Sequence, residues 1–140
     1  MMNVKSIIGG LIIFGSLQVI PVDRHYPPVI SDIKAPPEVK AVLRQSCYDC
    51  HSSETNWPWY GKIAPMSWLV TRDVNRGRKE LNFSNWNPLK SKKNIAEIYE
   101  EAHAGEMPLP LYQIAHPSAK LTVEDLQILK TWAEAAGADH

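Results

Sequence analysis

Two cysteines and a histidine are grouped in the pentapeptide Cys47-Tyr48-Asp49-Cys50-His51, which has the pattern C-x-x-C-H. Two thiols at this spacing are able to add to the two vinyl groups of one porphyrin, and the adjacent imidazole is then close enough to ligate its iron. The chain has no other cysteine. The motif therefore predicts one covalent haem c per chain, attached to Cys47 and Cys50, with His51 as the proximal iron ligand.

A Cys-x-x-Cys pair also occurs in redox dithiols, in half of a zinc site and in small disulfide loops. A dithiol of the thioredoxin type usually opens a helix after a strand, and the flanks of this motif show no strand-rich pattern. A zinc site needs two further ligands, for which His51, His103 and His116 are available, but the sequence has no second close ligand pair. These observations favour the haem interpretation over the other three.

The segments at both ends of the domain are predicted to be helices. Residues 38–46 carry apolar side chains at helical spacing, with Glu38 in the first turn, where the helix dipole favours a negative charge. This helix leads directly into Cys47. The C-terminal helix is expected over Thr122–Ala136, because Thr122 begins a capping box with the acidic residues that follow it and Gly137 is a typical helix stop.

The middle of the chain is expected to hold two further helices. One begins near Met66 and ends at about Arg76, before Gly77, and the other covers residues 95–104. Together with eleven prolines and five tryptophans, these helices indicate a small, loop-rich all-α domain over residues 38–137. A porphyrin would supply part of the apolar core that so small a fold needs.

The N-terminal part, residues 1–22, contains an apolar run from Ile7 to Val22. As a helix with a rise of about 1.5 Å per residue, this run spans about 24 Å, slightly less than a hydrocarbon core of about 30 Å. The first alanine of the chain is Ala35, so the A-x-A-like cleavage site of a signal segment is missing. We therefore expect an uncleaved membrane anchor rather than a removed signal, followed by a proline-rich tether over residues 23–37.

The order of these features resembles that of a class I cytochrome c: a helix, C-x-x-C-H, a long middle segment, a Met-Pro loop and a terminal helix. Such proteins carry their distal iron ligand in this loop, and the resemblance assigns that role to Met107 in Gly105–Leu109. A thioether is a soft ligand suited to haem iron, and the following proline stiffens the loop. Met66, His103 and His116 remain alternative candidates for the sixth position.

Several short motifs also resemble those of the bacterial haem-binding domain family, which consists of small membrane-anchored or exported monohaem proteins. The likeness extends from Pro27 to Trp132, and beside C-x-x-C-H it rests on Trp57–Tyr60, Ala64-Pro65, Arg72–Val74, Gly77-Arg78, Asn82–Trp86, Gly105–Pro110 and His116-Pro117. The family implies covalent haem and electron transfer with redox partner proteins. We therefore expect an electron carrier rather than an enzyme, in the bacterial inner membrane with its haem domain in the periplasm.

Two other functions would use the same cofactor. A haem with an open distal site would make the protein a sensor or a peroxidase-like enzyme, although no distal acid–base pair can be identified in the sequence. A haem that only staples an interaction domain is the third hypothesis. Lys plus Arg and Asp plus Glu both total 15, so the net charge gives no indication of a nucleic-acid partner.

Aromatic and basic side chains are candidates for direct contact with the haem. Five aromatic side chains are able to wall a porphyrin: Trp57, Trp59, Tyr60, Phe83 and Trp86. Three arginines are able to pair with its propionates: Arg72, Arg76 and Arg78.

Overall fold

Helices make up the regular secondary structure of residues 3–138, which the computed structural model describes, together with one isolated parallel bridge between Ser31 and Asn85. The α-helices are α1 (Val4–Leu17), α2 (Pro37–Ser46), α3 (Tyr48–His51), α4 (Met66–Glu80), α5 (Ser91–Ala104), α6 (Pro110–Ala115) and α7 (Val123–Ala138). Short 3-10 helices are η1 (Trp59–Lys62), η2 (Pro88–Lys90) and η3 (Pro117–Ala119). The predicted all-α fold is confirmed.

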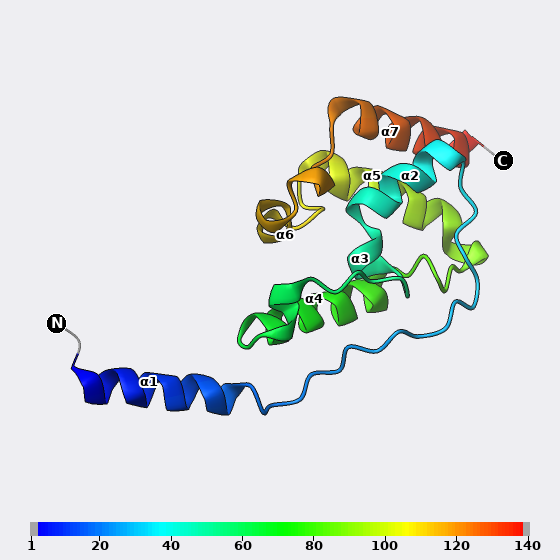
Figure 1. Cartoon of the computed structure of the whole chain (residues 1–140). Helices are drawn as coiled ribbons and strands as arrows, with labels where there is room; N and C mark the ends of the chain where they lie inside the picture. The colour runs from blue at the N-terminus through cyan, green and yellow to red at the C-terminus, as the bar shows by residue number, and fades with distance from the viewer. Residues whose placement is uncertain (1–2, 139–140) are drawn as a thin grey trace.

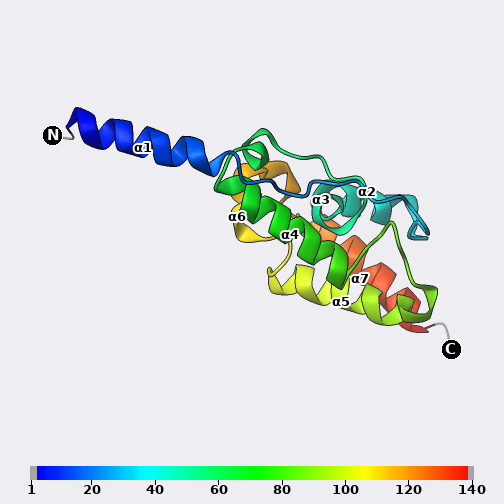
Figure 2. The ribbon, with the colours of Figure 1, turned by 90° about the horizontal axis from the view of Figure 1, so that it is seen from below.

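The helices of the domain form two groups that meet at α3. In one group, α7 packs against α5 and α2; in the other, α4 packs against α3 and η1 (Figure 1). Helix α1 projects away from both groups, and the view from below shows the same arrangement (Figure 2). The helix that enters the C-x-x-C-H motif thus contacts the C-terminal helix.

The apolar core lies where α2, α5 and α7 meet. Leu43 of α2 and Leu129 of α7 are fully buried, and Phe83 joins them from the loop after α4. Complete burial of such side chains stabilises the fold by about 1.5–3 kcal/mol each. The apolar side chains predicted at helical spacing in residues 38–46 therefore belong to the face that forms the core.

Helix α7 begins with the predicted capping box. The backbone N–H of Asp125 donates to Thr122 Oγ1 at 3.1 Å, and the N–H of Thr122 donates to Asp125 Oδ2 at 2.8 Å. The predicted stop at Gly137 is wrong, because α7 continues to Ala138. Since Gly137 keeps a negative φ, it remains compatible with the helix.

Helix α4 also runs past its predicted end. It continues through Gly77 to Glu80, and this glycine is a packing residue rather than a stop. A Cβ atom at this position would lie 2.6 Å from the carbonyl oxygen of Cys50, which is closer than real contacts allow. Gly77 therefore lets α4 approach the backbone of the C-x-x-C-H segment.

The segment 23–37, predicted to be a tether, is bound to the domain along much of its length. The N–H groups of Ile30 and Ser31 donate to the carbonyl of Ser84, and the N–H of Ile33 donates to that of Phe83. The Ile33 side chain is only 1% exposed. Because backbone groups supply these bonds and every residue carries them, no local pattern in the sequence indicated that this segment packs against the helices.

Two further contacts continue this attachment towards α1. Arg24 donates to the carbonyl of Gly61 at 3.0 Å, and the Gln18 side chain exchanges hydrogen bonds with the backbone of Ala64. Most apolar side chains of the 14-residue helix α1 are exposed. Within residues 3–138, no helix combines the length and apolar character needed to cross a membrane.

Candidate cofactor cavity

A cavity of about 1100 Å³ lies between α4 and α5. It is bordered on one side by residues 46, 47 and 49–51 in and before the C-x-x-C-H motif, and on another by residues 107–112 of the Met-Pro loop and α6. Small-molecule and cofactor sites typically have volumes of about 300–1,000 Å³, so this cavity is large enough for a porphyrin-sized ligand. The fold thereby brings the two predicted ligand segments to one cavity.

The imidazole of His51 is oriented by a backbone carbonyl. Its Nδ1 lies 3.0 Å from the oxygen of Leu81. A carbonyl oxygen only accepts, so Nδ1 carries the hydrogen and Nε2 keeps a free lone pair, which is the arrangement found at metal-ligating histidines. Burial lowers the pKa of His51, and the nearby carbonyls of Leu81 and Gly77 oppose this effect only in part. The neutral, ligating form is therefore favoured.

Cys47 and Cys50 both border the cavity and are free thiols. The N–H groups of Cys50 and His51 donate to the carbonyl of Cys47, so one helical turn presents all three side chains. Burial raises the pKa of both thiols to about 12. Reactive dithiols instead have a lowered pKa, so the redox-dithiol interpretation is disfavoured.

The zinc interpretation also finds no support in the geometry. In the part of the chain that the structure describes, no group of three or more His, Cys, Asp or Glu side chains is placed to hold a metal ion. His103 is exposed on α5 beside Tyr99, and His116 stacks on Tyr112. Neither borders the cavity.

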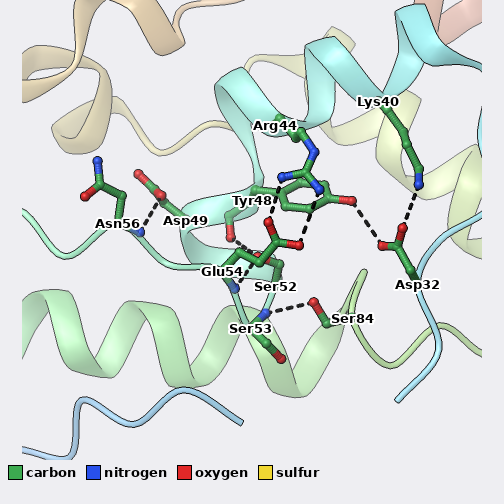
Figure 3. Close-up of polar contacts among 10 residues, drawn as sticks. All are labelled: Asp32, Lys40, Arg44, Tyr48, Asp49, Ser52, Ser53, Glu54, Asn56 and Ser84. Atoms are coloured by element: carbon green, nitrogen blue, oxygen red, sulfur yellow. Dashed lines mark hydrogen bonds and ion pairs between the residues drawn. The ribbon is translucent and has the colours of Figure 1, made fainter. Parts of the chain in front are cut away.

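Polar contacts fix the chain on both sides of α3 (Figure 3). Asp49 Oδ1 accepts from the N–H of Asn56 at 2.9 Å, and Ser52 Oγ donates to the carbonyl of Tyr48 at 2.7 Å. The N–H of Ser53 donates to the hydroxyl of Ser84 at 3.0 Å. The turn after C-x-x-C-H is thus held by bonds to both the motif and the loop that follows α4.

Met107 reaches the cavity through a tight turn at the end of α5. Gly105 has a φ of 75°, in the left-handed region that favours glycine, and ends the helix. The N–H groups of Glu106 and Met107 then both donate to the carbonyl of Glu101, at 3.0 and 3.2 Å. This turn leaves Met107 half-buried at the cavity wall.

Met66, the competing methionine, also borders the cavity, from the first residue of α4. It is 41% exposed, whereas Met107 is half-buried and precedes the buried Pro108. The four candidates for the sixth position are therefore reduced to two by location. His103 and His116 lie elsewhere.

The aromatic and basic candidates divide into two sets. Tyr60 and Phe83 border the cavity, as do Arg72 and Arg76. Four others do not border it: Trp57, Trp59, Trp86 and Arg78.

Three of these four residues have clearly different surroundings. Trp59 is 75% exposed, and Trp86 is buried in the core beside Phe83. The guanidinium of Arg78 donates to Ser52, Thr55 and His25 instead of facing the cavity, and it thereby joins α4 to two loops. The adjacent residue, Gly77, lies against the backbone of Cys50, so this turn of α4 packs on the C-x-x-C-H segment.

Tyr112 is a site residue that the sequence did not suggest. Its hydroxyl donates to Asp49 Oδ2 at 2.6 Å, and this bond joins the Met-Pro side of the cavity to the C-x-x-C-H motif. Burial, and the bond to Asp49, raise the pKa of Tyr112, so the phenol remains a donor at physiological pH. The one indication in the sequence was the position of Tyr112 shortly after the Met-Pro loop. The role of the Leu81 carbonyl had no such indication, because every residue carries a carbonyl.

A family model described as a haem-binding domain matches residues 12–135. This match covers most of the chain, so the protein belongs to the haem-binding domain family. The family resemblance inferred from the short motifs is confirmed at this level, and it supports haem as the cofactor. No curated protein and no solved structure matches the chain.

Proposed function

We propose that this protein is a monohaem c-type cytochrome that carries electrons. The observation that supports this most strongly is the position of Cys47, Cys50 and His51 on one wall of a porphyrin-sized cavity, with the His51 lone pair left free by the bond to Leu81. The thiols would form the covalent bonds and His51 would hold the iron. When bound, the haem supplies a one-electron couple between ferrous and ferric iron.

The other residues that line the cavity would determine the ligation, the potential and the reactivity of the haem. Met107 offers a thioether for the sixth position, and methionine with histidine raises the potential relative to two histidines. Arg72 and Arg76 are placed to pair with propionates. Among the described residues that line the cavity, His51 is the only histidine, so the wall offers no distal imidazole for proton transfer. This favours a carrier over a peroxidase-like enzyme.

The test is production of the protein with haem-maturation machinery, followed by haem staining after denaturing electrophoresis and a redox titration. We expect one haem per chain that survives denaturation, and reversible one-electron reduction. Haem lost on denaturation, or none at all, would contradict covalent attachment.

We also propose that α1 and the apolar residues after it attach the chain to the inner membrane, with the cavity on the periplasmic side. The support is the exposed apolar surface of α1, which would otherwise face water. A helix of 14 residues is about 21 Å long, so this attachment requires local thinning of the bilayer or insertion at its surface.

Partition of the full chain between membranes and buffer tests the attachment. Leu11→Glu with Phe14→Glu should release the protein from membranes, whereas Leu111→Glu with Ile114→Glu, a matched change on exposed α6, should not. A mature N-terminus after Leu17, found by mass spectrometry, would replace the anchor with a cleaved signal.

A further inference from the structure

The loop that carries Met107 continues into α6, and together they form one wall of the cavity. At its start, this wall is joined to α5 by the two bonds to the Glu101 carbonyl. Beyond its end, Ala119 of η3 is buried at 1% exposure, where η3 contacts α2. The contacts that hold the wall between these two points therefore determine how closely Met107 stays at the cavity.

Beyond the buried Pro108, apolar packing contributes little along this stretch. None of the residues of α6 is fully buried, and its side chains Leu111 and Ile114 are 69% and 76% exposed. The specific connection to the opposite wall is the bond from the Tyr112 hydroxyl to Asp49, at 2.6 Å. A short hydrogen bond to a carboxylate is stronger than one between neutral groups.

Both partners of this bond are themselves fixed. Asp49 lies inside the C-x-x-C-H motif, where its second oxygen accepts from the N–H of Asn56. The ring of Tyr112 stacks on His116 with 4.2 Å between centroids, and the hydroxyl of Tyr60 lies 3.4 Å from Nδ1 of His116. The bond thus joins two pre-ordered segments.

We propose that Tyr112 and Asp49 form a latch that holds the Met107 loop against the haem, so that a residue of the attachment motif controls the sixth iron position. Tyr112 and Asp49 are positioning residues. They would act on the iron only through the Met107 loop, by setting how often that loop is open. This inference rests on the proposed function.

The test compares the haem-loaded full chain with Tyr112→Phe, Asp49→Asn and Met107→Ala. Tyr112→Phe removes only the donor, and we expect about a tenfold faster association of carbon monoxide with the ferrous protein, together with a weaker Fe–S charge-transfer band in the ferric protein. Asp49→Asn keeps a neutral acceptor, so its effect should be smaller, about threefold. Tyr99→Phe is the matched control, because Tyr99 packs beside His103 on α5, away from the latch, and it should behave as wild type.

The outcomes separate the latch from the proposed function. Wild-type rates for both Tyr112→Phe and Asp49→Asn, with Met107→Ala clearly faster, would overturn the latch alone. A wild type that already binds carbon monoxide as fast as Met107→Ala would overturn the assignment of Met107 and the latch with it. Covalent haem in each variant confirms that it has folded, and if Tyr112→Phe fails this criterion, Asp49→Asn decides.

Discussion

The two walls of the cavity are held in different ways. One wall contains the C-x-x-C-H motif, where haem is proposed to attach, and is called the attachment side. Its fixed points are backbone atoms: the carbonyl of Leu81 orients His51, and Gly77 lies directly against the carbonyl of Cys50. On the loop side, a glycine turn at Gly105 and one side-chain bond from Tyr112 hold the chain. The backbone contacts on the attachment side change only if α4 moves, whereas the bond from Tyr112 to Asp49 is lost with a single hydroxyl group.

This difference teaches where the molecule tolerates motion. The proposed covalent attachment would need the two thiols and the imidazole in a constant arrangement, and the close backbone packing around them would provide it. The opposite wall has exposed side chains and few buried contacts, which are features of regions that open at low free-energy cost. Under the proposed function, the sixth iron position would therefore be the part of the site that exchanges ligands or responds to a partner.

The largest effect is expected from removing the attachment side altogether. Cys47→Ser combined with Cys50→Ser should abolish covalent haem and leave an unstable apoprotein. The reason is that a cavity of about 1100 Å³ would then be unfilled, and unfilled cavities destabilise a fold. Haem staining after denaturing electrophoresis and far-ultraviolet circular dichroism measure the two results. Full haem staining in the double variant would show that attachment uses other atoms.

The loop side is removed most directly by Met107→Ala. We expect loss of the Fe–S charge-transfer band, a lower midpoint potential, and carbon monoxide association at least about tenfold faster, as when a minor open state becomes the only state. Met66→Ala is the matched control and should leave the spectrum unchanged. Loss of the band in Met66→Ala instead would move the sixth ligand to the start of α4.

The packing of α4 on the attachment motif is tested by Gly77→Ala. The added methyl group would lie 2.6 Å from the Cys50 carbonyl oxygen, so we expect a loss of about 1–3 kcal/mol in the free energy of unfolding, measured with urea. Gly137→Ala in α7 is the control, because nothing lies within 4 Å of its new methyl group and alanine favours the helix. Equal stabilisation by both substitutions would show that α4 does not need this close approach.

The smallest effect is expected at the turn of the loop side. Gly105→Ala places a side chain at a φ of 75°, which costs about 1–2 kcal/mol, whereas Gly105→Asn should cost less, since asparagine tolerates this conformation. Because the strain is local, the charge-transfer band should weaken while covalent haem stays complete. A loss of covalent haem in Gly105→Ala would show that the two walls do not behave separately.

Much of the fold followed from local patterns. The apolar stripe of α2, the Thr122 capping box and the end of α5 at Ala104 lie within single elements, and each is read from a few neighbouring residues. The ends of α4 and α7 were misplaced, because a glycine was treated as a helix stop. At Gly77 that reading failed for a tertiary reason: the glycine is needed by a segment distant in sequence.

Only those parts of the site that lie in a recognisable sequence motif were predictable. C-x-x-C-H and the Met-Pro loop indicated segments that the structure places on one cavity, although covalent attachment and iron ligation remain predictions. The aromatic cluster was less informative, since side chains within one short stretch face different ways: Tyr60 borders the cavity while Trp59 points to solvent. The bond from Tyr112 to Asp49 depends on the path of α6, which no local pattern encodes.

The attachment of the N-terminal segment to the domain has a consequence for distance. Gln18 is bonded to Ala64, only two residues before Met66 at the cavity, and the chain beyond it is bonded again at Gly61 and Ser84. The rate of electron tunnelling falls steeply as the gap between two centres widens. Under the proposed electron-carrier function, a chain joined to its domain in this way would hold the cavity at one height above the membrane surface that α1 contacts. It would then suit a partner whose redox centre lies at that height.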